Sequence, residues 1–172
     1  MERFPRLYSP RLCLRKLQVE DFPSLVQHAN NKKISDNIIN IPNPYREPDA
    51  AFRMSYVHQG FVKKARYVFA ITFKESDEFV GEISLHLNSN KPIAELGYWV
   101  GEDFWNRGIA TEAIAEILNF GFAILKLEHI FATCHIDNPA SSKLLVKNGL
   151  EAVPTKGNVL QYQISKATHH TQ

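Results

Sequence analysis

Phe-Trp-Asn-Arg-Gly-Ile-Ala-Thr-Glu-Ala, residues 104–113, joins a strand-like run at 93–100 to a helical run at 111–125. Where a strand leads through a glycine-containing turn into a helix, several backbone N–H groups converge. The first N–H groups of the helix have no hydrogen-bond partner within the helix. Gly108 permits dihedrals that a side chain hinders and lets an anion approach the backbone. The spacing therefore indicates a phosphate-binding turn, although an ordinary strand-to-helix connection fits it as well.

Two neighbours of Gly108 favour the anion-binding interpretation. Ala110 is small and leaves the backbone accessible, and Arg107 places a fixed positive charge beside the turn. After the turn, apolar residues recur at helical spacing as far as Leu125, which predicts an amphipathic helix. The turn is thus expected to stand between a buried strand and a buried helix face.

Length and composition limit the class of protein. A chain of 172 residues with 44% hydrophobic and 22% charged residues suits one domain, 1–172, with a sizeable core. The net charge of +2 gives no reason to expect nucleic acid or a membrane surface as a partner. Two cysteines make neither a disulfide framework nor a metal site, and the start of the chain lacks an apolar signal segment. We therefore expect a cytoplasmic protein, monomeric or homodimeric, without a metal.

The first half of the chain predicts a strand, two helices and three further strands. Alternating basic and apolar residues at 11–17 predict a strand with one buried face, and a helix should follow from Glu20 to about residue 30. Residues 38–48 are irregular, and a helix should cover 48–63. Runs at 67–73, 79–87 and 93–100 predict an antiparallel meander. The inner side of the 48–63 helix is predicted to hold Ala51, Phe52, Met54, Tyr56 and Val57.

The second half alternates helices and strands. A strand at 129–136 follows the 111–125 helix, so the two strands on either side of that helix should be parallel. Asn138 and Pro139 open another helix, which Gly149 should end, and a hairpin should span about 150–165. His129, Cys134 and His135 lie close in sequence, but their spacing is not that of a zinc site.

Three segments together resemble the GNAT acyl-CoA N-acyltransferases. They are 94–100, 105–113 and 138–150, and the branch that they are most similar to is the ribosomal-protein-alanine N-acetyltransferases. The opening at 10–15, followed by Glu20 and Asp21, is similar to the same branch, and the likeness is weakest over 31–65. The resemblance implies an α/β (α+β) fold: a mixed, mostly antiparallel sheet of about seven strands flanked by about four helices.

The resemblance also implies a cofactor, acetyl-CoA as cosubstrate. The family's pyrophosphate loop reads Q/R-x-x-G-x-G/A; Gly108 and Ala110 match it, while Trp105 stands where Gln or Arg is usual. In the family, the strands before and after the helix separate, and the acyl-pantetheine arm lies between them like an added strand. The residues expected to contact the cofactor are Trp99 and Val100 at the thioester, the stretch Asn106, Arg107, Gly108, Ile109, Ala110 and Thr111 at the diphosphate, and Asn138.

The implied reaction is direct attack of an amine on the acetyl thioester in a ternary complex. Glu95 is the candidate base, since the family often uses an acid on this strand; the alternative is a strand carboxylate paired with Arg or Lys. Many members carry a Tyr acid on the later helix, but Leu145 occupies that position here. Ser141 is the nearest hydroxyl and the substitute candidate; the alternative is a helix-capping serine.

The sequence identifies the acceptor less well than the cofactor. Within the family it is a small-molecule or peptide amine: a protein N-terminus, a ribosomal protein, an amino acid, a polyamine or a drug. The loop at 34–46 and the last hairpin should shape that choice. An alternative from another class is a non-catalytic acyl-CoA-binding or regulatory module on the same scaffold.

Overall fold

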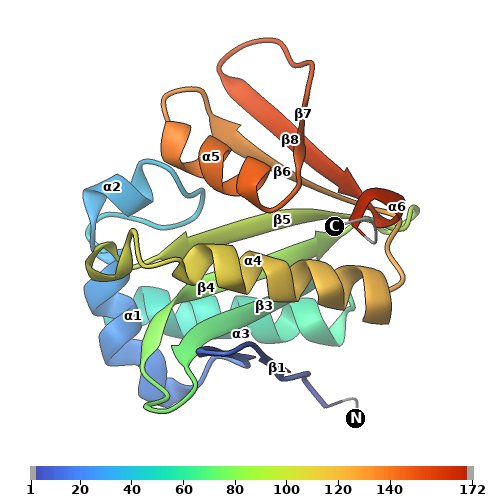
Figure 1. Cartoon of the computed structure of the whole chain (residues 1–172). Helices are drawn as coiled ribbons and strands as arrows, with labels where there is room; N and C mark the ends of the chain where they lie inside the picture. The colour runs from blue at the N-terminus through green and yellow to red at the C-terminus, as the bar shows by residue number, and fades with distance from the viewer. Residues whose placement is uncertain (1–2, 170–172) are drawn as a thin grey trace.

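The computed structural model describes residues 3–169 and places eight strands in one mixed sheet (Figure 1). The spatial order of the strands is β1-β2-β3-β4-β5-β6-β8-β7, and every recorded pairing is antiparallel except that of β5 with β6. The strands are β1 (Leu7–Tyr8), β2 (Leu12–Arg15), β3 (Arg66–Phe73), β4 (Phe79–Leu87), β5 (Ile93–Val100), β6 (His129–His135), β7 (Glu151–Val153) and β8 (Val159–Ser165).

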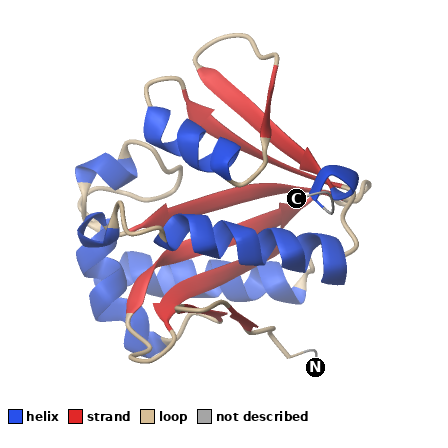
Figure 2. Cartoon of the chain, in the orientation of Figure 1, coloured by secondary structure: helices blue, strands red, loops and turns tan. Residues whose placement is uncertain are grey.

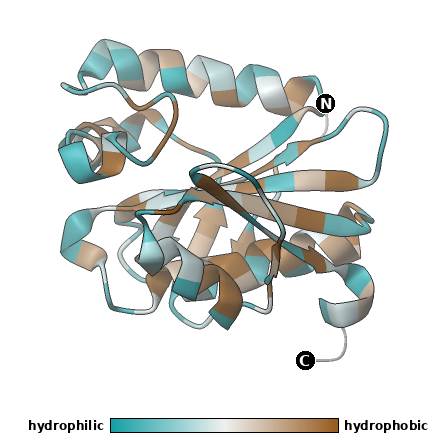
Figure 3. Cartoon of the chain, turned by 90° about the horizontal axis from the view of Figure 1, so that it is seen from above, coloured by the Kyte–Doolittle hydropathy of each residue, from teal (hydrophilic) through white to brown (hydrophobic). Residues whose placement is uncertain are grey.

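Helices cover both faces of the sheet (Figure 2). They are α1 (Phe22–Ala29), α2 (Lys32–Ser35), α3 (Glu47–Val62), α4 (Ile109–Asn119), α5 (Pro139–Lys147) and α6 (Lys166–His169). Helices α4 and α5 lie on one face and α1 and α3 on the other, so the sheet is the middle layer when viewed from above (Figure 3). No helix within residues 3–169 is long and apolar enough to cross a bilayer.

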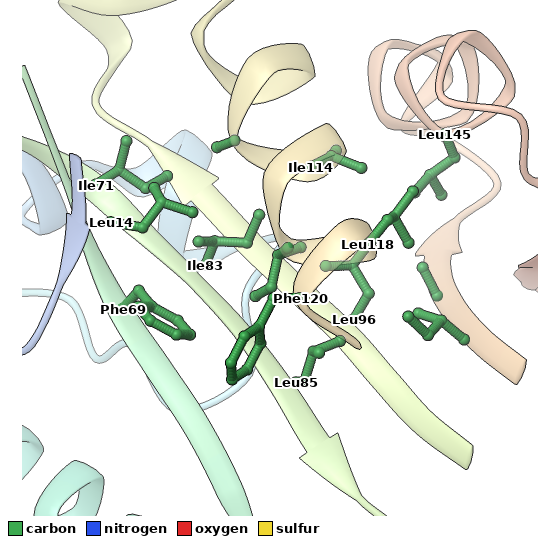
Figure 4. Packing of buried hydrophobic residues seen from close by; sticks show 14 of the residues in the cluster. Leu14, Phe69, Ile71, Ile83, Leu85, Leu96, Ile114, Leu118, Phe120 and Leu145 are labelled. Carbon is green, nitrogen blue, oxygen red and sulfur yellow. The ribbon is translucent and has the colours of Figure 1, made fainter. Parts of the chain in front are cut away.

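The larger core lies between α4 and the middle of the sheet (Figure 4). Ile114 and Leu118 of α4 belong to the same buried cluster as Ile83 on β4, Leu96 on β5 and Leu145 on α5. Burying a side chain of this size stabilises the fold by about 1.5–3 kcal/mol. This packing fixes the position of α4, and therefore of the turn that precedes it.

The expected strands and helices are confirmed, with short additions and one difference: the helix expected at 111–125 is α-helical over Ile109–Asn119 and continues as a π-helical turn over Phe120–Ile124. The meander of β3, β4 and β5 is antiparallel, and β5 pairs with β6 in parallel across α4, as the strand, helix, strand order predicted. The additions are the two-residue strand β1 and the four-residue helices α2 and α6. Elements this short bury too few side chains to leave a periodic pattern in the sequence.

Two predictions about burial are wrong. Strand β2 has both faces buried, not one: Arg15 is 2% exposed because its guanidinium bonds Asp21 and Asp77. For α3 the prediction is wrong only in part. Val57 is buried and Met54 packs against the core, as predicted, but Ala51 is exposed and Phe52 is 73% exposed, while Ala50 and Gly60 are buried. Apolar residues fall on more than one face of α3, and the sequence pattern alone does not choose between those faces.

The feature that positions the site is the divergence of β5 from β6. Their pairing covers only Ile93–Glu95 against His129–Phe131. Beyond Glu95 the two strands separate, and β6, β8 and β7 fan away from the rest of the sheet in Figure 1. The sheet therefore opens between the carboxyl-terminal halves of β5 and β6.

Candidate active site

The backbone of β5 faces the opening at Tyr98 and Val100. The amide of Gly101 donates to the carbonyl of Val80 at 2.8 Å, so Gly101 belongs to a hydrogen-bonded pair with β4. Such pairs alternate along an antiparallel ladder, and the residues between them direct their N–H and C=O groups to the other side. The amide N–H of Val100 accordingly points into the opening, as a donor for an acyl carbonyl requires.

The turn before α4 has the geometry that its sequence indicated. Gly108 is the N-terminal cap of α4 with φ 74°, and Asn106 also has positive φ, at 60°. The helix begins its hydrogen bonding with the amide of Glu112, which donates to the carbonyl of Gly108 at 3.1 Å. The N–H groups of residues 109–111 precede that bond and have no partner within the helix. Residues 105–108 are exposed, so the turn itself is open to solvent.

Two residues from distant parts of the chain brace this turn. Arg11 donates from its guanidinium to the carbonyl of Arg107 at 2.9 Å and to the carboxylate of Glu112 at 2.6 Å. Ser9 donates to the other oxygen of the same carboxylate at 2.5 Å. Burial opposes ionisation of Glu112, but these hydrogen bonds hold its pKa below the usual value. Sequence reasoning missed this brace because about a hundred residues separate its members.

Trp105 links the turn to the end of β5. Its indole Nε1 donates to the carbonyl of Val100 at 2.7 Å, while the side chain stays 40% exposed. The ammonium of Lys33 lies 5.9 Å from the centre of the indole ring and also forms an ion pair with Glu102. Where the family usually has a flexible Gln or Arg, this chain thus has a rigid ring that fixes the separation between Val100 and the turn.

Glu95 lies at the point where β5 and β6 separate. Its side chain is on the face opposite α4, because alternation puts Ala94 and Leu96 in the α4 core. Thr133 of β6 donates to its Oε1 at 3.3 Å. Within residues 3–169 this is the polar contact that the structure records for the Glu95 side chain; no Arg or Lys is recorded against it. The carboxylate is half-buried, so a substrate amine or a water reaches it.

His86 is the cross-strand neighbour of Glu95 on β4. Its Nε2 lies 3.1 Å from the hydroxyl of Ser84. Burial, together with the positive charges of Arg66 and Arg53, lowers the pKa of His86. The imidazole is therefore neutral at pH 7, and it does not add a positive charge beside the carboxylate.

Behind Glu95, a buried charged pair supports β5. Glu82 of β4 is 3% exposed and accepts hydrogen bonds from the guanidinium of Arg53 at 2.9 Å and from the indole Nε1 of Trp99 at 3.0 Å. The indole of Trp99 is therefore on the α1 and α3 face, and its backbone pairs with Glu82. Tyr45 is buried in the same cluster. Nothing in the sequence pattern distinguishes Glu82 or Arg53 from ordinary surface charges.

Asn138 and Ser141 lie on the other side of the opening, at the start of α5. Asn138 caps the helix by accepting the backbone N–H of Ser141 at 3.1 Å, and its amide donates to Asn37 at 3.3 Å. The Ser141 hydroxyl lies 2.7 Å from the hydroxyl of Tyr98, so it bridges α5 to β5. Capping is thus carried by Asn138, and the Ser141 hydroxyl is directed at the strand.

The structure brings most of the predicted site residues to the opening between β5 and β6. Residues 106–111 form one surface, Val100 lies beside it, and Glu95 and Ser141 lie on the two faces of the opening. Ile109 has its side chain in the core, so it offers its backbone alone. Within residues 3–169, no group of three or more His, Cys, Asp and Glu side chains has the arrangement of a metal site.

The chain is similar in sequence to known acetyltransferases. The sequence model described as "Acetyltransferase (GNAT) domain" matches residues 11–151. An uncharacterized N-acetyltransferase, p20 of Bacillus licheniformis, is 31% identical over 141 residues, 81% of this chain and 78% of that protein. The ribosomal-protein-serine acetyltransferase of Escherichia coli is 34% identical over 80 residues, 45% of this chain and 43% of its own.

A solved structure repeats the fold. The Microcin C7 self-immunity acetyltransferase MccE, crystallised with acetyl-CoA and AMP, has a TM-score of 0.79 at 17% identity over 91% of this chain and 93% of its own. The family match favours an enzyme over a non-catalytic module, with acetyl-CoA as cosubstrate and N-acetyl transfer as the reaction. The parted strands, the glycine turn and the family match agree: this chain belongs to the GNAT acetyltransferases, which use acetyl-CoA.

Proposed function

We propose that the acceptor is the primary amine of a peptide N-terminus and that it attacks acetyl-CoA directly in a ternary complex. The observation that carries the proposal is the divergence of β5 and β6, which sets Glu95 at one end of an opening and the Gly108 turn near the other. A cosubstrate that lies in that opening has its acyl group between the two strands. One face of the sheet is then open to the acceptor amine, and groups on the other face contact the sulfur.

The cosubstrate is held mainly by backbone. The amides of residues 106–111 bind its diphosphate at the start of α4, and Arg107 adds charge beside it. The pantetheine arm runs along Tyr98 and Val100 as an added strand. The Val100 N–H donates to the thioester carbonyl, where charge develops in the transition state, a contribution of about 2.7–4 kcal/mol if it acts as an oxyanion-hole donor. Asn138 lies across the opening and contacts the arm from the α5 side.

Glu95 takes the proton that the attacking amine must lose. An ammonium has no lone pair, so attack requires deprotonation, and the Glu95 carboxylate receives the proton directly or through one water. The nitrogen then bonds to the acetyl carbon, the C–S bond breaks, and the thiolate leaves with the electron pair. Ser141 donates a hydrogen bond to the sulfur from the opposite face.

A peptide acceptor is supported by the name of one relative and by two segments near the opening. The E. coli relative is named for a ribosomal protein. The loop from residue 34 to 46 meets α5 through Asn37 and Asn138, and the β7–β8 hairpin forms the edge of the fanned half of the sheet (Figure 1). These two segments border the Glu95 side of the opening and select what enters it.

An acceptor screen that follows free CoA tests the proposal. Purified protein and acetyl-CoA are incubated with peptides that begin with serine or alanine, including ribosomal-protein N-termini, and with spermidine and free amino acids. We expect release of CoA with at least one peptide, and mass spectrometry should place one acetyl group on its α-amine. Turnover with the small amines alone would overturn the peptide assignment and leave the family assignment in place.

Replacing Gly108 with alanine should weaken acetyl-CoA binding about three- to tenfold. A Cβ at φ 74° costs roughly 1 kcal/mol in the turn and shifts the amides that face the diphosphate. Gly157 is the matched control, because it has φ 90° and open space around it and lies in the turn between β7 and β8, outside the assigned diphosphate site. Calorimetry should find weaker binding for Gly108→Ala and unchanged binding for Gly157→Ala; equal affinities in both variants would contradict the assigned diphosphate site.

A further inference from the structure

We propose that Tyr98 positions the Ser141 hydroxyl and strengthens its hydrogen bond to the departing thiolate. The inference rests on the proposed function, in which Ser141 faces the sulfur, and it assigns Tyr98 a role that the sequence did not reveal. The family's usual tyrosine on the later helix is replaced by Leu145, which is fully buried and has no hydroxyl. A phenol from strand β5 reaches the same helix from the other side.

The geometry puts both hydroxyls at the opening. Tyr98 lies three residues beyond the last β5–β6 pair, and its side chain packs against the α4 core. Ser141 lies in the first turn of α5, after the cap Asn138. The two oxygens lie 2.7 Å apart, the usual length of a hydrogen bond between hydroxyls, so the orientation of the serine hydroxyl depends on the phenol. It joins the two halves of the sheet where they part.

The phenol acts as a donor that stays protonated. Burial raises the pKa of Tyr98 to about 12, and the hydrogen bond with Ser141 opposes part of that shift. Either hydroxyl can donate in this contact. In the proposed arrangement the protonated phenol donates to the Ser141 oxygen, which leaves the Ser141 proton for the sulfur. In the reaction the N–C bond forms, the C–S bond breaks, and sulfur takes the electron pair. The amine's proton leaves through Glu95 and reaches the thiolate through solvent, so neither hydroxyl is consumed.

The other hydroxyls near α5 do not have this arrangement. Ser142 is the next residue, but its oxygen lies 3.4 Å from the sulfur of Cys134, on the β6 side. A role in packing alone would be served by phenylalanine at position 98, since the ring and not the oxygen fills the core. The oxygen is what the Ser141 contact uses, and removing it alone separates the two roles.

Kinetics of three variants, with two control variants, test the pair. Ser141→Ala should lower kcat about 10–100-fold, the value of a hydrogen bond to a charged group, and Tyr98→Phe about 5–10-fold. The double variant should be no slower than Ser141→Ala alone, because Tyr98 acts through the serine. KM for acetyl-CoA should change less than twofold. Ser142→Ala and Tyr8→Phe, a half-exposed tyrosine at the β1 edge, should retain full activity.

A second measurement needs no acceptor. The thiol of bound CoA is titrated by the ultraviolet absorbance of its thiolate. We expect its pKa to be lowest in the wild type, higher in Tyr98→Phe and highest in Ser141→Ala. Equal thiol pKa values in all three proteins, or rate losses that multiply in the double variant, would overturn the proposal. Failure of every acceptor would count against the proposed function and leave this titration to decide the role of Tyr98.

Discussion

Replacing Glu95 with glutamine should lower kcat by 10²–10⁴-fold while acetyl-CoA binds as before. The amide is nearly the same size as the carboxylate and still accepts from Thr133, but it takes no proton from the attacking amine. The cosubstrate should be unaffected, because its proposed contacts lie on the turn and on the β5 backbone at Tyr98 and Val100. Steady-state rates with the acceptor found by screening, and calorimetry with acetyl-CoA, measure the two quantities.

The matched control is Glu75→Gln, in the exposed turn between β3 and β4, which should change neither quantity. If Glu95→Gln keeps a tenth or more of the wild-type rate, Glu95 is not the base. The next candidate is then His86, because it is the cross-strand neighbour and its lowered pKa keeps the imidazole neutral. The variant His86→Gln distinguishes the two residues in the same assay.

The turn at Gly108 was predictable because its chemistry is local. A glycine with positive φ, a small residue two positions later and a helix start lie within a few residues, so one stretch of sequence defines the amide surface. The parallel pairing of β5 and β6 was predictable for a related reason: a strand, a helix and a strand in sequence have few ways to pack. Such features depend on neighbours along the chain.

The supports of the site were not predictable, because their partners are distant. Arg11 and Glu112 are about a hundred residues apart, and either one alone resembles a solvated surface charge. Arg15 stands in an alternating strand where a basic residue usually faces solvent, yet Asp77 from the β3–β4 turn and Asp21 enclose it. A charged side chain is buried where the fold places an oppositely charged partner beside it, and a single sequence does not identify that partner.

The contact of Tyr98 with Ser141 is intermediate between these cases. Ser141 is the hydroxyl predicted in place of the missing tyrosine, a local signal, and Asn138 is the residue that caps α5. The direction of the Ser141 hydroxyl depends on Tyr98, forty-three positions away. Thus the sequence indicated a hydroxyl at the opening, and the fold determines which group orients it.

Replacing Arg53 with methionine should destabilise the protein by about 3–5 kcal/mol, a large share of the stability of a domain this size. The substitution leaves the Glu82 carboxylate, 3% exposed, with Trp99 Nε1 as its remaining recorded partner. Methionine fills a similar volume, so the loss of stability measures the effect of the unpaired Glu82 charge more than the effect of a cavity. Urea unfolding at pH 7 measures the free energy. The contrasting control is Lys32→Met, which breaks the exposed pair with Asp36 and should cost about 0.5 kcal/mol.

The double variant Arg53→Met with Glu82→Gln should recover most of that loss. Glutamine removes the buried charge and keeps an oxygen for the Trp99 indole, so the position of Trp99 on β5 is preserved. If the double variant is as unstable as Arg53→Met, the guanidinium supports β5 by packing and not by neutralising Glu82. The alternative outcome is that the double variant recovers stability and keeps the wild-type Kd for acetyl-CoA. In that case the charged pair stabilises β5 and does not contribute to cosubstrate binding. The β5 backbone at Val100 is then held by the ladder with β4 and by Trp105, not by the charge of the pair.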